Sequence, residues 1–270
     1  MIYDCFTFFN ELDLLEIRLE ELYPVVDKFI ICESTKTHSG KDKPLRYLEN
    51  IDRYSKYQDK INYVVYKDFP TPKQWSYGDN WIMEGNQRRF LISGLKLRDL
   101  QDEDIVLVSD LDEIPKRSFL ENLNTKDLPD VVTLCSQLYY GKINHKVVSP
   151  PEYNNWRGTV LIKGRAIQRN PDLHYYRINK DGFHCVRDTG SWHFSYVGTA
   201  DQIVNKIESY LHSEYDTPDI KNKISDNLKE CKDVLNRSEF KLEKVEIDQS
   251  YPEAVKNNIN KYEDIINLSI

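Results

Sequence analysis

The first half of the chain alternates short apolar runs with stretches of helical periodicity. Strand-like runs cover residues 2–9, 29–32, 61–66, 105–108 and 131–138. Apolar residues at helical spacing, or helix-start signals, cover residues 12–22, 48–57, 81–100 and 115–123. Strands that alternate with helices are typical of βαβ units around a largely parallel sheet. The pattern therefore predicts an α/β fold whose ligands bind beyond the carboxyl ends of the strands.

The second half of the chain has a different pattern. Residues 139–196 read as short strands and polar or aromatic loops, and residues 200–270 are charged and mainly helical in pattern. No Gly/Ser-rich linker separates them. We expect residues 1–215 to form one domain, with halves 1–138 and 139–215, and residues 216–270 to form a helical extension packed on it.

Composition narrows the class of ligand and compartment. The formal charge of −7 argues against nucleic-acid binding, which needs a basic surface. The five Cys are scattered without a C-x-x-C pair, so we expect a reducing compartment, with Cys5, Cys32 and Cys135 as core thiols. The N-terminus has no signal-peptide pattern, and no run of about 20 apolar residues marks a membrane span. A cytoplasmic protein is therefore expected.

An acidic segment, Ser109-Asp110-Leu111-Asp112-Glu113, follows the strand at 105–108 directly. Two carboxylates one residue apart, after a buried strand, can face one side of a tight loop and bind Mg²⁺ or Mn²⁺. Such an ion would bridge diphosphate oxygens and neutralise a leaving nucleoside diphosphate. The same Asp-x-Asp pattern also occurs in solvated turns, and the preceding strand favours the functional interpretation.

A phosphohydrolase of the haloacid dehalogenase type also has a strand followed by Asp-x-Asp. Asp110 would then be a phosphoryl-accepting nucleophile. That arrangement normally opens its domain, whereas roughly a hundred residues of βα pattern precede it here. No later strand ends in a convincing second Asp pair.

The sequence resembles glycosyltransferase family 17, the family of the β-1,4-mannosyl-glycoprotein β-1,4-N-acetylglucosaminyltransferases. Matching motifs are spread from about residue 3 to 215 and are far more specific together than Asp-x-Asp alone. They are Phe8 to Leu19, Glu33 with Thr37 to Pro44, Glu84 with Gln87-Arg88, Ser109 to Pro115, Trp156-Arg157-Gly158, and Trp192 to Ser195.

The resemblance implies a GT-A fold, a Rossmann-like mixed sheet flanked by helices, and an inverting transfer. It implies UDP-N-acetylglucosamine as donor, a glycan acceptor and a divalent cation, Mn²⁺ or Mg²⁺. Residues 1–138 would bind the nucleotide sugar, and residues 139–215 would bind the acceptor. The animal enzymes are Golgi-anchored and act on N-glycans, whereas a bacterial or viral glycan is an equal candidate here. A catalytically silent carbohydrate-binding relative is the alternative from another class.

Three residues in the first half are candidates for nucleotide binding. Asn10 and Glu11 close the first strand, where a GT-A enzyme places its nucleotide-binding loop. Glu11 equally fits a favourable charge at a helix N-terminus. Glu33 ends the second strand, where a carboxylate commonly meets the base or ribose.

Basic side chains offer further contacts to a diphosphate. Arg88 belongs to the matched Gln87-Arg88 pair, and its guanidinium can donate paired hydrogen bonds to a diphosphate. Arg89, beside it, is the weaker candidate of the two. Lys41 and Lys43 are expected to be solvated.

The late Trp-His segment supplies a candidate metal ligand. Many GT-A enzymes use a late His as the third protein ligand, and His193 matches this, although a buried core histidine is the alternative. Trp156 is a candidate for stacking on the donor or acceptor sugar, with core packing as the alternative.

An inverting transfer also needs a group that accepts the proton of the acceptor hydroxyl. Asp188, just before the Trp-His segment, is the candidate base, and capping of a turn is the alternative. Glu113 and Glu152 are the next candidates.

Overall fold

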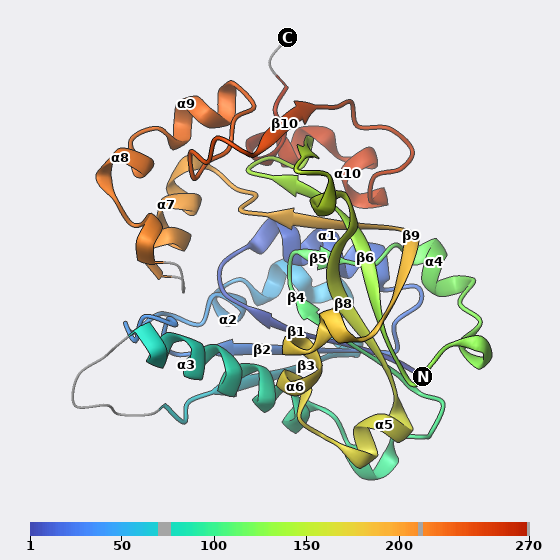
Figure 1. The fold of residues 1–270 in the computed structure, drawn as a ribbon. Coiled ribbons are helices and arrows are strands. Elements are labelled where there is room, and N and C mark those ends of the chain that lie inside the picture. Colours follow the sequence, from blue (N-terminus) through green and yellow to red (C-terminus); the bar gives the residue numbers. More distant parts are fainter. Residues whose placement is uncertain (70–76, 210–212, 269–270) are drawn as a thin grey trace.

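Four parallel strands form the first half of the sheet in the structure, a computed structural model that describes residues 1–69, 77–209 and 213–268. Their spatial order is β3-β2-β1-β4, and the strands are β1 (Ile2–Phe8), β2 (Lys28–Ser34), β3 (Ile61–Tyr66) and β4 (Ile105–Asp110). These are the strands that the apolar runs predict. Since parallel strands end at the same edge, the carboxyl ends of β1, β2 and β4 lie side by side (Figure 1).

Antiparallel pairing continues the sheet beyond β4. The order there is β4-β8-β6-β7-β10, with β6 (Val131–Tyr140), β7 (His145–Ser149), β8 (Trp156–Lys163) and β10 (Lys241–Lys244). A long strand, β9 (His184–Ser195), runs parallel to β6 and also pairs with the two-residue β5 (Glu113–Ile114). In this last pairing Glu113 lies opposite His193. The topology thus joins the acidic segment to the Trp-His segment.

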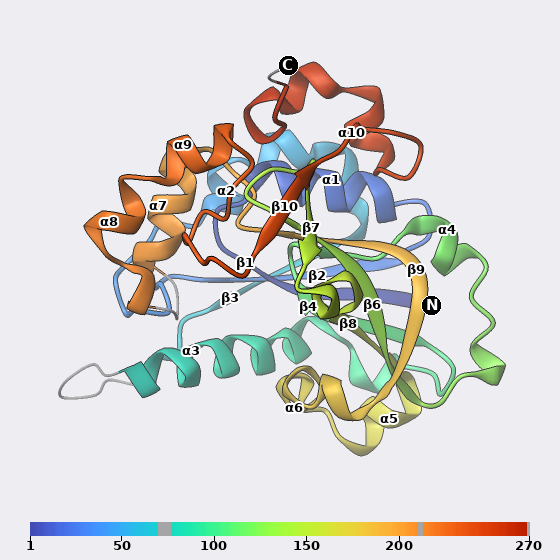
Figure 2. The same ribbon diagram turned by 45° about the horizontal axis from the view of Figure 1, so that its top comes forward.

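Helices cover both faces of the sheet, as Figures 1 and 2 show. One face packs against α1 (Leu12–Leu22), the 3₁₀ segment Ile51–Lys60 and α10 (Glu253–Asn257). The other packs against α3 (Tyr77–Phe90), α5 (Gly164–Arg169) and α6 (Leu173–Ile178). The remaining helices are α2 (Arg46–Glu49), α4 (Arg117–Glu121), α7 (Ala200–Ser209), α8 (Pro218–Lys221) and α9 (Ile224–Lys229). Mixed sheet and flanking helices confirm the predicted fold class.

Three segments differ from expectation. The helix predicted at 48–57 is one turn of α-helix, α2, followed by 3₁₀ structure. The helix predicted at 81–100 begins at Tyr77 and ends at Phe90. The C-terminal extension also supplies an edge strand, β10, which the charged sequence Lys-Leu-Glu-Lys concealed. Charged residues suit an edge strand because its free side faces water.

The cysteines only partly follow the prediction. Cys5 and Cys32 are buried free thiols, as expected. Cys135 is not free, because it forms a disulfide with Cys185. Parallel pairing of β6 with β9 brings the two Cα atoms within 6.5 Å, a contact between residues 50 apart in sequence. The cysteines therefore do not indicate a reducing compartment.

A first prediction concerns the pH dependence of stability. It rests on His145, which begins β7 and packs against the C-terminal segment. The ring is fully buried, and its Nε2 lies 2.9 Å from Asn267 Nδ2. Burial, reinforced by Lys142 and Lys244, lowers the pKa of His145 to about 4. The unfolded chain takes up this proton near pH 6.5, so stability is lost as the pH falls from 6.5 toward 4.

Between pH 7 and pH 5 this loss of folding stability amounts to about 2 kcal/mol. Urea unfolding of the wild type and of His145→Gln at both pH values measures it. The variant is expected to lose about 2 kcal/mol less than the wild type over this interval. Equal losses would show that His145 takes up no proton on unfolding.

Candidate active site

A cavity of about 340 Å³ opens at the carboxyl ends of the parallel strands. Residues after β1 and β2 line one end, and the acidic segment lines the middle. Aromatic residues from β6, β8, β9 and the segment after α9 line the other end. This position agrees with the edge expected from the sheet topology.

Arg18, on α1, fixes the shape of the acidic segment. Both Arg18 and its partner Asp4 are fully buried, and their ion pair has an Nη2–Oδ1 distance of 2.6 Å. Arg18 Nη1 also donates to three backbone carbonyls at 3.0 Å each, and Nη2 donates to a side-chain hydroxyl at 2.7 Å. The acceptors are Asp110 O, Leu111 O, Glu113 O and Ser109 Oγ. One guanidinium therefore holds the whole turn from inside the core.

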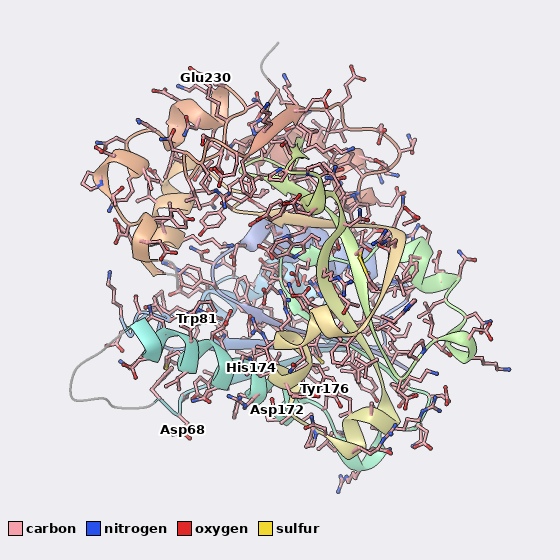
Figure 3. The ribbon with its side chains drawn as sticks, viewed as in Figure 1. Asp68, Trp81, Asp172, His174, Tyr176 and Glu230 are labelled. Carbon is pink, nitrogen blue, oxygen red and sulfur yellow. A yellow bond between two sulfur atoms is a disulfide. The ribbon has the colours of Figure 1, made fainter. Side chains whose placement is uncertain are left out.

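Asp110 is clamped by two arginines from the α3–α6 side of the sheet. Arg88 Nη2 donates to Oδ1 and Arg177 Nη2 donates to Oδ2, each at 2.8 Å. Burial would raise the pKa of Asp110, but Arg177 and Arg88 outweigh it and hold the pKa well below its usual range. His174, on α6 (Figure 3), lies beside this clamp, with Nδ1 3.4 Å from Arg88 Nη1. Asp110 is thus an ionised carboxylate at neutral pH, with both oxygens engaged.

Glu113 is enclosed by three donors. Its carboxylate accepts from Arg177 Nη2 at 2.7 Å, from the indole N–H of Trp156 at 2.9 Å and from the backbone N–H of Asp110 at 3.1 Å. Burial would raise its pKa, but Arg177 outweighs this and lowers it. The Trp156 ring in turn contacts His193, with centroids 4.8 Å apart. Glu113 and Trp156 therefore position each other.

Asp112 and His193 face each other across the middle of the cavity. Asp112 Oδ1 is 3.6 Å from His193 Nε2, and both side chains are about nine-tenths buried. Burial raises the pKa of Asp112, against the influence of Lys206 and His193. Burial likewise lowers the pKa of His193, so its imidazole is neutral at pH 7.

Lys206, from α7, enters the same space. Its Nζ is 3.0 Å from Glu11 Oε1 and 3.5 Å from Asp112 Oδ2. Burial would lower the pKa of Lys206, but these two carboxylates outweigh it and raise the pKa. The cavity therefore carries a positive charge, at its centre, supplied by a helix from the second half of the chain.

The residues present fit a divalent cation in part. A buried carboxylate and a neutral imidazole face each other, and His193 Nδ1 has no hydrogen-bond partner among the described residues. Asp110, the third predicted ligand, is engaged by its two arginines. No three His, Cys, Asp or Glu side chains converge into a complete metal site in the described part of the chain. Mg²⁺ and Mn²⁺ commonly take one or two protein ligands and complete their shell with substrate phosphates and water.

Several predicted site residues lie elsewhere. Glu33 is fully buried outside the cavity lining, and it accepts from Lys43 Nζ, Tyr63 Oη and the backbone N–H groups of Arg46 and Tyr47. It anchors the start of α2, so no oxygen is free for a ribose. Lys43 is correspondingly buried rather than solvated. Lys41, by contrast, reaches the backbone carbonyl of Glu208 at 3.5 Å.

The remaining candidates divide between the cavity and the surface. Glu11 lines the main cavity, whereas Asn10 does not and contacts Asn205. Asp188 and Glu152 are exposed and do not line the cavity. Asp188 lies within β9, where the pairing with β6 is irregular, and has a φ of 55°. Its placement gives the base assignment no support.

Three side chains that contact the acidic segment escaped the sequence analysis. Lys206 lies in a charged, helical stretch and Arg177 in an aromatic stretch read as loop, and nothing in either pattern separates them from solvated residues. Only the tertiary fold brings them to the acidic segment. Arg18 lies within the first matched motif, Phe8 to Leu19, and that motif was the available signal.

The sequence profile of glycosyltransferase family 17 matches residues 1–239 of the 270. The chain belongs to glycosyltransferase family 17. It is therefore a glycosyltransferase, and its acidic segment is not the nucleophile loop of a phosphohydrolase.

Curated relatives agree with this membership. The human β-1,4-mannosyl-glycoprotein 4-β-N-acetylglucosaminyltransferase is 36% identical over 112 residues, which cover 40% of this chain and 20% of the human protein. The mouse protein of the same name is 35% identical over 112 residues, with the same coverage. The chain thus matches only about a fifth of the length of these relatives.

Similar solved structures include the apo form of the glycosyltransferase GlyE of Streptococcus pneumoniae TIGR4. It is 13% identical, with a TM-score of 0.36 over 69% of this chain and 44% of that one. HddC of Yersinia pseudotuberculosis is 9% identical, with a TM-score of 0.38 over 72% and 90%. Among the described helices of this family 17 member, none is long and apolar enough to cross a bilayer.

Proposed function

We propose that the protein is an inverting, metal-dependent transferase that moves N-acetylglucosamine, or a related sugar, from a UDP-sugar to a glycan hydroxyl. The observation that carries the proposal is the facing pair of Asp112 and His193 beside the clamped Asp110, in a cavity at the carboxyl edge of a family 17 sheet. The name of the human relative supports the choice of N-acetylglucosamine.

The cavity residues divide the work. Asp112 and His193 would hold the cation, which when bound would neutralise the diphosphate as the leaving group departs. Lys206 would add a fixed positive charge on the other side of Asp112. Arg88 and Arg177 keep Asp110 ionised and hold the turn in place.

The proton acceptor belongs among the carboxylates that line the cavity. A general base must come within hydrogen-bond reach of the acceptor hydroxyl. Asp188 is exposed and outside the lining, so we withdraw it from this role. Glu11 lines the cavity, and although burial would raise its pKa, Lys206 outweighs this and lowers it, so Glu11 is ionised at neutral pH.

UDP release tests the proposal. With Mn²⁺, the protein is expected to release UDP from UDP-N-acetylglucosamine, and chelation by EDTA is expected to stop the release. UDP-glucose and UDP-galactose at the same concentration report donor preference. A simple phosphomonoester is expected to yield no phosphate.

Two results would overturn the proposal in different ways. UDP release that persists in excess EDTA would remove the metal from the mechanism. Failure to bind UDP, together with failure to release it, would favour the catalytically silent carbohydrate-binding relative.

A further inference from the structure

The end of the cavity away from β1 and β2 is an aromatic wall made of Trp156, Tyr153, Phe240 and Tyr140. Neighbouring ring centroids along it are 6.0 Å, 4.9 Å and 6.0 Å apart. At its inner end Trp156 contacts His193. The wall therefore runs continuously from the centre of the cavity outward.

Distant parts of the chain build this wall. Tyr140 ends β6, Trp156 begins β8, and Tyr153 lies in the 3₁₀ segment Pro151–Asn155 before it. Phe240 lies after α9, in the C-terminal region expected to be only an extension. That region is therefore part of the cavity.

One polar group on the wall lacks a partner. Tyr140 is 4% exposed and lines the cavity, and its hydroxyl has no hydrogen-bond partner among the described residues. A buried hydroxyl normally finds a partner, because leaving it unsatisfied is costly. A ligand that offers hydroxyl groups would satisfy it.

The arginine that packs on the wall is neutralised by a carboxylate. Arg237 packs 3.6 Å from the Phe240 centroid, but Asp233 accepts from its Nε and Nη2 at 2.9 Å each. Closer to the centre, the carboxylates of Glu11 and Asp112 share the single ammonium of Lys206, which leaves a net negative charge there. An anionic ligand would gain nothing from the paired Arg237 and would be repelled by the carboxylates of Glu11 and Asp112.

We propose that the aromatic wall is the subsite for a neutral saccharide acceptor, which stacks on Tyr153 and Phe240 and hydrogen-bonds to the Tyr140 hydroxyl. The inference rests on the proposed function, because a donor bound at the β1–β2 end leaves this end to the acceptor. Aromatic faces bind the apolar faces of sugar rings, while the phenol tip supplies the hydrogen bond.

Titration by nuclear magnetic resonance, with no donor present, tests the subsite. The probes are chitotriose and mannotriose, which are neutral, and sialyllactose, which is anionic. We expect saturable binding of at least one neutral probe and at least tenfold weaker binding of sialyllactose, on the order expected for one unfavourable charge contact. Tyr140→Phe removes only the hydroxyl and is expected to weaken the neutral probe about fivefold.

Tyr153 supplies the matched pair of variants. Tyr153→Ala removes an aromatic face and is expected to weaken binding about tenfold, whereas Tyr153→Phe keeps the face and the affinity. Affinity for UDP in Mn²⁺ is expected to stay unchanged in all three variants. Unchanged saccharide affinity in Tyr153→Ala, or no saturable neutral probe, would overturn the subsite.

A nucleobase site would give the opposite pattern. If Tyr153→Ala weakened UDP and left the saccharide unaffected, the wall would hold the donor, and the inference would be wrong. Saccharide binding is measured without turnover, so it remains a test even if UDP release fails. Failure of transfer and failure of the subsite are thus separate results.

Discussion

Replacement of Arg18 by Met is expected to lower the free energy of unfolding by about 3–5 kcal/mol. The change leaves the Asp4 carboxylate fully buried without its partner. It also removes the donor for the carbonyls of Asp110, Leu111 and Glu113. Urea unfolding at pH 7, followed by circular dichroism, measures the loss.

Two further variants separate charge burial from loop positioning. Arg117→Met removes a half-exposed arginine, paired with Glu121 at 3.5 Å, and is expected to cost less than about 1 kcal/mol. Asp4→Leu with Arg18→Met removes both buried charges and is expected to recover much of the stability. Activity is expected to stay low in this double variant, because the turn still lacks its donor. Wild-type stability in Arg18→Met would contradict the role of Arg18.

Replacement of Asp112 by Asn is expected to reduce UDP release by about 10³-fold. The amide keeps the size of the side chain but cannot supply a charged ligand for the cation. Since the carboxylate faces Lys206 and His193 across the cavity and does not hold the turn, the fold is expected to survive. Initial rates at saturating donor, with circular dichroism to check folding, measure the effect.

Asp188→Asn is the matched control for this change. It makes the same chemical replacement at an exposed carboxylate outside the cavity. We expect it to keep activity within about twofold, as surface substitutions usually do. A large loss in Asp188→Asn would return the base to that residue and contradict its exclusion from the site.

The parallel half of the fold could be predicted because its strands are continuous apolar runs. β1, β2, β3 and β4 all appear where those runs lie, and Asp110 ends β4 as expected. The other half resisted prediction because its pairings join distant segments. Cys135 meets Cys185 only when β6 and β9 pair, and β10 is too charged and short to show strand periodicity.

The proximity of the candidate residues could be predicted where the local sequence carries the signal. Asp112 and His193 face each other, and Arg88 contacts Asp110. The two carboxylates after the strand indicated Asp110 and Asp112, and the matched family motifs indicated Arg88 and His193. Glu33 instead binds the start of α2 and lies outside the cavity lining, a contact that only the tertiary fold creates. Arg177 and Lys206 were missed because a charged residue on a helix shows no target in sequence.

The proposed mechanism depends above all on Asp112 and His193, which would bind a cation together with the donor's diphosphate. Calorimetric titration of UDP into the wild type and Asp112→Asn, each with Mn²⁺ and with EDTA, tests this most directly. The wild type is expected to bind UDP at least about tenfold more tightly with Mn²⁺, and the variant is expected to lose this dependence. Equal UDP affinity with and without Mn²⁺ in the wild type, or an unchanged Mn²⁺ dependence in the variant, would contradict it.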